Sequence, residues 1–229
     1  MKSFCFIPAK LASTRLKKKN ILKLNDKELL YYPIVAAQES NLFKREDIIV
    51  SSEAKEVRDV ATKYGATSFK RDDKLAHDPY GIVDVVLEFL EKSSKYKEYE
   101  LCFILLPTSP TVKSFDLTKA SEIFENTNCK YLMSVNESEH NAQTQVFIKD
   151  SFIEPLFKDE IVKKSQELEK TYHINGIVTI VDVKDFLKTK TYFSYPLATY
   201  IIGRDRAIDI DTKEDLMLAK LIMDDTSND

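Results

Sequence analysis

The amino-acid sequence predicts an α/β fold with a mostly parallel sheet and helices on both of its faces. Short apolar runs alternate with helix-length amphipathic segments over residues 1–135, an order typical of parallel strands joined by crossover helices. The run 101–106 is apolar at every position, as in a strand buried on both faces. Hydrophobic residues make up 43% and charged residues 31% of the 229 positions, which is enough apolar material for a sizeable core.

The expected elements follow in chain order. The run 4–8 is too short for a helix and ends at a proline, so it is interpreted as the first strand. Apolar residues at helical spacing predict a helix over 29–43. The later elements are expected to be a strand at 47–52, helices at 52–65 and 82–90, the strand at 101–106, a helix at 114–124 and a strand at 131–135. Because ligands of such sheets bind beyond the carboxyl ends of the strands, a site is expected in the loops after Pro8, Ser52 and Leu106.

Residues 137–172 follow a different pattern. Short apolar and polar pieces alternate there, and the segment 158–170 is highly charged. We interpret this stretch as a small inserted lid or dimerisation segment, so that residues 1–136 and 173–229 form the main domain. In the second of these parts, strands are expected at 177–183 and 199–202 and a last helix at 213–223, with fraying over 224–229.

Composition excludes several classes of protein. The net charge of −3, from 34 basic and 37 acidic residues, argues against a dedicated nucleic-acid binder. No apolar run approaches the roughly 20 residues that a membrane-spanning helix needs, so we expect no membrane partner. The first apolar stretch is too short for a secretory signal, and the three cysteines are widely spaced, so we expect a cytoplasmic protein with reduced cysteines. The spacing of the four glycines cannot spell the dinucleotide fingerprint or the P-loop. Any phosphate must therefore be held mainly by side chains.

A basic loop, residues 9–20, directly follows the first expected strand, and we call it the first loop. It contains five cations, Lys10, Arg15, Lys17, Lys18 and Lys19, together with the hydroxyls of Ser13 and Thr14. Arginine offers a bidentate fork and lysine a mobile point charge, so the loop can hold a triphosphate or a sugar acid. A solvated basic loop is the alternative, but the position after the first strand favours phosphate binding.

Two aspartates near the end of the sequence form a candidate metal site. In an extended segment, residues i and i+2 share a face, so Asp209 and Asp211 are expected on the same side. Two carboxylates near phosphates suit Mg²⁺, which completes its octahedron with water and phosphate oxygens. As an alternative, Asp211 or Thr212 can cap the last helix, and Thr212 to Asp215 resembles a capping box. A cap explains one aspartate and leaves Asp209 unexplained.

Other residues give weaker signals. Arg71 lies in a charged segment and is more typical of a surface ion pair. Asn175 and Gly176 precede an apolar run and predict a tight turn. The three histidines lack the spacing of metal ligands. Ser109 lacks the glycine setting of a hydrolase nucleophile.

Five blocks of the sequence, in the right order, resemble the cytidylyltransferases that activate acidic sugars, above all the CMP-sialic acid (acylneuraminate) synthetases. They cover nearly the whole chain, which makes the combination specific although any one block alone is weak. The blocks are Ile7-Pro-Ala-Lys-Leu-Ala-Ser-Thr-Arg-Leu-Lys-Lys-Lys-Asn20, Arg71-Asp-Asp-Lys-Leu-Ala-His-Asp78, Leu105-Leu-Pro-Thr-Ser-Pro110, Asn175-Gly-Ile-Val-Thr-Ile180 and Asp209-Ile-Asp-Thr-Lys-Glu-Asp-Leu216.

The resemblance implies a Rossmann-like nucleotidyltransferase fold and a homodimer held through the inserted segment. It implies transfer of CMP from CTP to a nine-carbon, sialic-acid-like sugar acid, with release of pyrophosphate and a requirement for Mg²⁺ or another divalent cation. The catalytic residues that it implies are Lys19, Asp209 and Arg15. The nucleotide-binding residues that it implies are Lys10, Ser13, Asn20 and Arg71. The sugar-binding residues would be Tyr172 and Asn175, and the metal ligands Asp209 and Asp211.

The sequence departs from the family pattern mainly where the sugar should bind. Lys10 replaces an arginine, and Leu11-Ala12 replaces a small pair that is often two glycines. Leu106 replaces a glutamine, and no serine stands at 79–82. We therefore predict a related nine-carbon or eight-carbon acid, or weakened activity, rather than N-acetylneuraminate itself.

Three alternatives remain open at this point. One is a cytidylyltransferase for the eight-carbon acid KDO. Another is a glycosyltransferase of the GT-A class, which also combines an α/β sheet with paired aspartates, although these usually close a strand in the middle of the chain. The third is a non-enzymatic sensor or scaffold that kept the fold and lost the chemistry.

Overall fold

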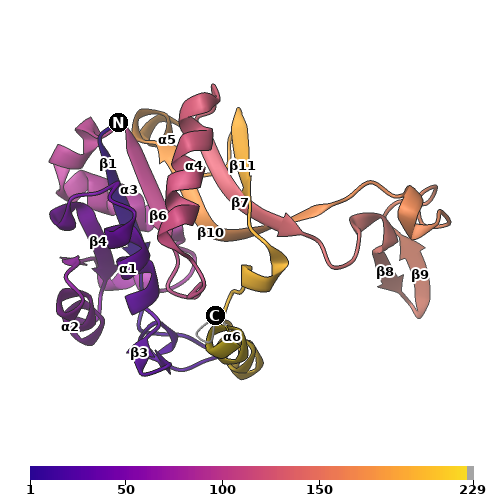
Figure 1. Cartoon of the computed structure of the whole chain (residues 1–229), viewed down its shortest axis with the longest axis horizontal. Coiled ribbons are helices and arrows are strands. Elements are labelled where there is room, and N and C mark those ends of the chain that lie inside the picture. The colour runs from indigo at the N-terminus through magenta and orange to yellow at the C-terminus, as the bar shows by residue number, and fades with distance from the viewer. Residues whose placement is uncertain (226–229) are drawn as a thin grey trace.

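The computed structural model describes residues 1–225, and its centre is a seven-stranded sheet (Figure 1). The strands are β1 (Ser3–Pro8), β4 (Ile48–Ser52), β5 (Thr67–Lys70), β6 (Leu101–Leu105), β7 (Tyr131–Glu137), β10 (Tyr172–Asp182) and β11 (Leu197–Ile201). They lie in the order β11-β7-β10-β6-β1-β4-β5. All neighbours are parallel except β10, which runs antiparallel to both β6 and β7. The prediction of a mostly parallel α/β sheet is confirmed.

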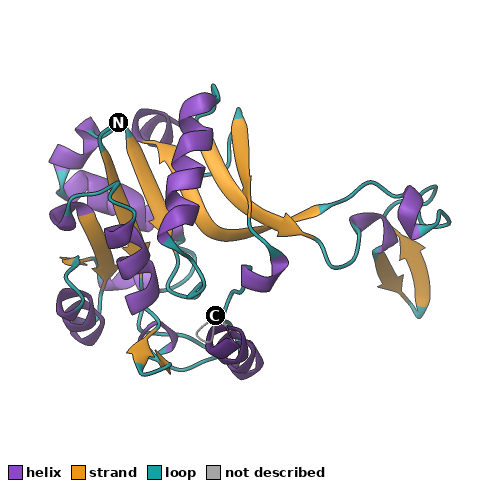
Figure 2. Ribbon diagram, viewed as in Figure 1, coloured by secondary structure: helices purple, strands orange, loops and turns teal. Residues whose placement is uncertain are grey.

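Helices cover both faces of this sheet (Figure 2). They are α1 (Tyr31–Glu39), α2 (Lys55–Lys63), α3 (Ile82–Lys92), α4 (Ser114–Asn126), α5 (Val183–Thr189) and α6 (Lys213–Asp225). One core lies between the sheet and α1, α2 and α4, and a second lies between the opposite face and α3 and α5. Strand β6 is apolar at every position because both of its faces are buried. Phe103 and Leu105 enter the first core, whereas Cys102 and Ile104 enter the second.

The predicted elements are present with shifted ends. The expected helix over 29–43 is shorter, and the strand expected at 177–183 begins earlier, at Tyr172. Sequence reasoning missed β5 and α5. Residues 226–229, part of the stretch expected to fray, lie outside the described residues. Among the described residues, no helix is both long and apolar enough to span a bilayer.

The prediction of a tight turn at Asn175 and Gly176 is wrong, because both residues lie inside β10. Pairing between β10 and β7 shifts register between Ile174 and Thr179, and Gly176 has a φ of +65°. An irregularity of this kind needs a residue that tolerates positive φ, and glycine does so without steric cost. The Asn-Gly pair therefore marks a bulge within a strand rather than a hairpin.

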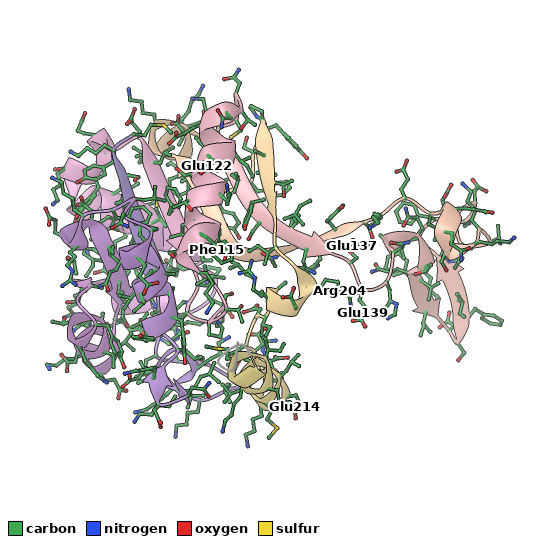
Figure 3. The ribbon with its side chains drawn as sticks, in the orientation of Figure 1. Phe115, Glu122, Glu137, Glu139, Arg204 and Glu214 are labelled. Atoms are coloured by element: carbon green, nitrogen blue, oxygen red, sulfur yellow. The ribbon has the colours of Figure 1, made fainter. Side chains whose placement is uncertain are left out.

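Between β7 and β10, residues 138–171 extend away from the sheet and its helices, and we call this segment the arm (Figure 1). It carries a small hairpin of β8 (Val146–Lys149) and β9 (Phe152–Pro155). Figure 3 shows Glu137 and Glu139 where β7 runs into the arm, with Arg204 beside them. The Arg204 guanidinium lies 3.6 Å from the Glu139 carboxylate, and Lys170 Nζ lies 3.0 Å from the Glu137 carboxylate. The base of the arm is thus tied to the body by charge pairs.

After β11 the chain returns along the loop that follows β6. Arg206 donates to both carboxylate oxygens of the buried Asp116, at 2.8 and 2.9 Å. The Ile210 amide donates to the Thr108 carbonyl at 2.8 Å. Beyond this point, α6 packs beside the first loop and the short strands β2 (Lys23–Leu24) and β3 (Lys27–Glu28), through a third apolar cluster of Leu16, Leu24, Leu29, Ile208, Ile210 and Ala219. The end of the chain is thereby placed against its beginning.

Candidate active site

A cavity of about 290 Å³ lies beyond the carboxyl ends of β1 and β6. We call it the nucleotide cavity, after the ligand that the sequence resemblance implies. The position is the one that parallel sheets favour for ligands. Its walls come from the first loop, Arg71, the start of α3, the loop after β6 and the segment that leads into α6. The lining residues that sequence reasoning predicted are Lys10, Ser13, Arg15, Lys19, Asn20, Arg71 and Asp211.

Two cations of the first loop share one carboxylate at the wall of this cavity. Lys19 Nζ lies 2.6 Å from Asp211 Oδ1, and an Arg15 guanidinium nitrogen lies 2.7 Å from Asp211 Oδ2. The Lys19 and Asp211 side chains are 15% and 29% exposed, whereas Arg15 is 65% exposed. Residues 192 positions apart in sequence therefore meet, and the predicted meeting of the first loop with the second aspartate is present in the structure.

Asp211 is not the cap of α6, so its side chain is free for these contacts. The Thr212 amide donates to Asp215 Oδ2 at 2.8 Å, and the Asp215 amide donates to Thr212 Oγ1 at 3.2 Å. This reciprocal pair is the capping box that the sequence suggested. Burial raises the pKa of Asp215, but hydrogen bonds from the Asp211 amide and from Thr212 outweigh it and hold that pKa below its usual range.

Asp209 is placed differently from Asp211. The buried Ile208 and Ile210 alternate with the more exposed Asp209 and Asp211, as an extended segment predicts. Asp209 is exposed and does not line the nucleotide cavity. Within residues 1–225, no cluster of three or more potential metal-ligating side chains occurs. Asp211 is therefore the member of the pair that lines the cavity. A carboxylate there fits Mg²⁺, since this ion commonly takes one or two carboxylates and fills its shell from substrate phosphates and water.

Arg71 is buried rather than on the surface. Its side chain is 3% exposed, and it donates to Glu53 Oε2 from Nε at 3.1 Å and from a terminal nitrogen at 2.6 Å. Glu53 Oε1 accepts the Leu11 amide at 2.8 Å, and Asn20 Nδ2 donates to the Lys10 carbonyl at 2.7 Å. Burial raises the pKa of Glu53, but the Leu11 amide and the Arg71 guanidinium lower it by more, so the carboxyl is held below its usual range. Glu53 therefore connects Arg71 to the backbone of the first loop.

Sequence reasoning missed Glu53 although a signal was available. The residue comes directly after β4, at the same edge of the sheet as the first loop. Carboxyl ends of parallel strands gather there, so an acidic residue at this point could have been paired with a nearby cation.

Removing the charge of Glu53 is expected to damage both stability and activity. In Glu53→Gln the Arg71 guanidinium keeps its burial but loses its counter-charge, and breaking a buried pair in this way costs about 3–5 kcal/mol. Displacement of the first loop is expected to lower kcat/KM for CTP, the substrate that the sequence resemblance implies, by a factor on the order of 10². Denaturant unfolding and steady-state kinetics measure the two effects. Asp59→Asn is the matched control, because Asp59 on α2 forms only an exposed pair with Lys55. Equal unfolding free energies and equal kcat/KM values in the two variants would show that Glu53 does not hold Arg71 and the first loop in place.

A second, smaller recess adjoins the nucleotide cavity. It has a volume of about 200 Å³, and we call it the apolar recess. It shares Ile82 and Leu106 with the nucleotide cavity. Its full lining is Ile82, Ile104, Leu106, Met133, Ile174, Asn175, Gly176, Thr179 and Tyr192.

The two residues expected on the sugar side differ in position. Asn175 lines the apolar recess, but its amide is largely engaged within the sheet: Oδ1 accepts from Ser134 Oγ at 2.6 Å and Nδ2 donates to Asn136 Oδ1 at 3.2 Å. Tyr172 is 45% exposed, pairs with Glu137 at the base of the arm and lines neither the cavity nor the recess. The structure thus brings Asn175, but not Tyr172, to the site.

The sheet, its flanking helices and the cation-lined cavity at the strand ends are those of an α/β nucleotidyltransferase. The chain belongs to the cytidylyltransferase family, whose sequence model matches residues 4–223. This confirms the family that the five sequence blocks suggested.

Individual relatives and structures agree with this assignment. The chain is 30% identical to the pseudaminic acid cytidylyltransferase of Campylobacter jejuni subsp. jejuni serotype O:2, over 97% of this chain and 96% of that protein. It is 31% identical to the N-acylneuraminate cytidylyltransferase of Escherichia coli O18:K1:H7, over 95% of this chain and 51% of that longer protein. Among solved structures, a CMP:2-keto-3-deoxy-manno-octonic acid synthetase complexed with CTP superposes with a TM-score of 0.73 at 13% identity, over 99% of this chain and 100% of that one. The last likeness concerns the fold alone.

Proposed function

We propose that this protein activates a nine-carbon sugar acid by transferring CMP from CTP, with release of pyrophosphate. The observation that carries the proposal is the meeting of Lys19, Arg15 and Asp211 at the wall of one cavity within a cytidylyltransferase fold. Two relatives that cover at least 95% of the chain are named for pseudaminic acid and N-acylneuraminate, both nine-carbon acids. Together these observations favour CTP and such an acid as the substrates.

The charges of the cavity suit a reaction at the α-phosphorus of CTP. The anomeric hydroxyl of the sugar acid attacks this phosphorus, and the bond to pyrophosphate breaks. Catalysis of such a step rests on positioning and on neutralising charge in the transition state. Lys10, Arg15 and Lys19 would supply that neutralisation from the first loop. As phosphate oxygens arrive, Lys19 and Arg15 can turn to them from Asp211, which frees the Asp211 carboxylate.

A divalent cation fits this arrangement. Asp209 and Asp211 would hold Mg²⁺, which when bound would add positive charge beside the phosphate oxygens. Asn20 would support the phosphate side of the site indirectly, because its amide holds the Lys10 carbonyl. The nucleotide side would include Ser13 and Arg71, which line the same cavity.

Substrate profiling tests the proposed reaction. Pyrophosphate release is measured with CTP, UTP, GTP and ATP, each combined with Mg²⁺ and a panel of eight-carbon and nine-carbon ulosonic acids. Turnover with CTP and a nine-carbon acid is the expected result. Preference for the eight-carbon acid would move the assignment to a KDO-type enzyme. Transfer from a nucleotide-sugar without pyrophosphate would favour a glycosyltransferase, and CTP binding without any turnover would favour a non-enzymatic role.

We also propose that the protein is a homodimer joined through the arm. A two-stranded hairpin alone is at best marginally stable in water, so it needs a surface to pack against. Apolar side chains on the arm hairpin are nevertheless exposed in the single chain: Ile148 by 77%, Phe152 by 77% and Ile153 by 70%. Ile148 and Ile153 are cross-strand partners on one face of the hairpin, and Phe152 lies on the other face. Exposed apolar groups on both faces of so small a hairpin are typical of an interface.

Charged substitutions on the hairpin are expected to separate the dimer. The double variant Ile148→Glu, Phe152→Glu should sediment as a monomer at concentrations where the wild type is a dimer, because each glutamate would be buried without a partner. Lys158→Glu, an exposed change in the same arm, should leave the dimer intact. A wild-type protein that sediments as a monomer throughout, or a double variant that still dimerises, would refute the proposal.

A further inference from the structure

The apolar recess differs in chemistry from the nucleotide cavity that it adjoins. None of the residues that line it is charged. Five aliphatic or thioether side chains, from α3, β6 and its following loop, β7 and β10, form most of its wall: Ile82, Ile104, Leu106, Met133 and Ile174. Because Ile82 and Leu106 also line the nucleotide cavity, a group attached to a molecule beside CTP can reach into the recess.

The polar groups of the recess are few, and the Asn175 amide is already engaged within the sheet. Asn175 Oδ1 already accepts from Ser134 Oγ at 2.6 Å and from the Ile177 amide at 3.2 Å, and Nδ2 donates to Asn136 Oδ1. The remaining polar side chains are the hydroxyls of Thr179 and Tyr192. A hydroxyl group buried in the recess would exchange its bonds to water for contacts with these two hydroxyls at most, because the other lining side chains are apolar or engaged, and such a loss is costly.

Leu106 is the residue that makes the recess apolar next to the nucleotide. It stands where the resembling family carries a glutamine, directly after β6. Its Cδ1 would lie 3.6 Å from a Cβ placed on Gly176, so leucine and glycine are neighbours in the wall of the recess. A glutamine at this point would offer an amide to a ligand hydroxyl, whereas leucine offers only methyl groups.

We propose that the apolar recess takes a methyl-terminated substituent of the sugar acid, and that Leu106 sets the preference for this group over its hydroxylated equivalent. The substituent has two possible sources with the same chemistry, the methyl of an acylamido group and a deoxy terminal carbon. The proposal rests on the proposed function, because the recess is relevant only if a sugar acid lies beside CTP. An apolar pocket discriminates against one added hydroxyl by up to about 10²-fold, which sets the size of the effect.

Matched pairs of acids test the proposal. With CTP and Mg²⁺, kcat/KM is compared for N-acetylneuraminic against N-glycolylneuraminic acid, and for 9-deoxy-N-acetylneuraminic against N-acetylneuraminic acid. The methyl-terminated member of at least one pair should be preferred by about 10- to 100-fold. The pair that shows the preference identifies which substituent enters the recess.

Two variants connect the preference to the recess. Leu106→Gln should reduce it to less than about threefold, because the new amide can bond a hydroxyl, whereas the apolar, volume-conserving Leu106→Met should keep it. Ile174→Gln provides an independent change of the wall, and because Ile174 is 44% exposed this variant is expected to fold. It should weaken the preference in the same direction.

The outcomes separate this inference from the proposed function. Turnover of the acids with no preference in either pair would overturn the inference alone. A preference that is unchanged in both Leu106→Gln and Ile174→Gln would do the same. Absence of turnover with these acids and with the whole panel of eight-carbon and nine-carbon acids, in a folded protein that binds CTP, would overturn the proposed function and the inference with it.

Discussion

A Lys19→Met variant is expected to lose kcat with CTP by a factor on the order of 10²–10³, the usual cost of removing one preorganised charge partner. Lys19 Nζ lies 2.6 Å from Asp211 Oδ1, and its side chain is only 15% exposed, so its charge is held at the cavity wall. Methionine has a similar length without the charge. Pyrophosphate release at saturating CTP and sugar acid measures the loss.

The control for this variant is Lys23→Met. Lys23 is exposed on β2, does not line the nucleotide cavity, and its loss should leave kcat close to the wild-type value. Lys19→Arg should recover part of the activity, because it restores the charge with a different geometry. If Lys19→Met kept kcat within about threefold of the wild type, Lys19 would not be part of the charge-neutralising machinery.

Asp211→Asn is expected to lower kcat by a factor on the order of 10²–10³ and to raise the Mg²⁺ concentration that gives half-maximal activity. The asparagine keeps the size of the side chain but removes the negative charge between Lys19 and Arg15. Without metal, CTP should bind this variant at least as tightly as it binds the wild type. In the wild type the Asp211 carboxylate competes with the phosphates of CTP for Lys19 and Arg15, and the variant lacks this competitor. Metal titrations of activity and calorimetry with CTP alone measure the two effects.

Two further aspartates complete this comparison. Asp209→Asn should share the metal dependence of Asp211→Asn if both carboxylates hold the cation, although Asp209 is outside the cavity wall. Asp205→Asn, an exposed change upstream, should behave as the wild type. An unaltered Mg²⁺ requirement in both Asp209→Asn and Asp211→Asn would show that the metal, if required, is held elsewhere.

The sequence allowed the sheet and the meeting of its two ends to be predicted for a physical reason. Strands buried on both faces need apolar residues at every position, as in 101–106, and such runs are visible without a structure. Ligands of parallel sheets lie at the carboxyl ends of strands, so the position of the first loop was informative. The contact of Lys19 with Asp211 then followed from two patterns. The basic loop is suited to hold phosphates, and the paired aspartates are suited to hold a metal ion beside the same phosphates.

Other features depend on three-dimensional proximity and could not be predicted. Side-chain periodicity is the same for both strand directions, so the antiparallel course of β10 was not visible. Strand β5 lies at the sheet edge with mostly exposed side chains and lacks an apolar run. Arg71 was expected on the surface because the position of Glu53 after β4 can indicate an ion-pair partner but not that the pair would be buried. The apolar recess joins residues from several separate segments.

The packing of residues 208–219 onto the first loop has a consequence for local unfolding of the protein. Leu16, Leu24 and Leu29 share one apolar cluster with Ile208, Ile210 and Ala219, although most of the sequence separates the two groups. Detachment of α6 would therefore expose the apolar side of the first loop and withdraw Asp211 from Lys19 and Arg15. Local opening of this helix is thus coupled to the arrangement of the cations at the cavity wall.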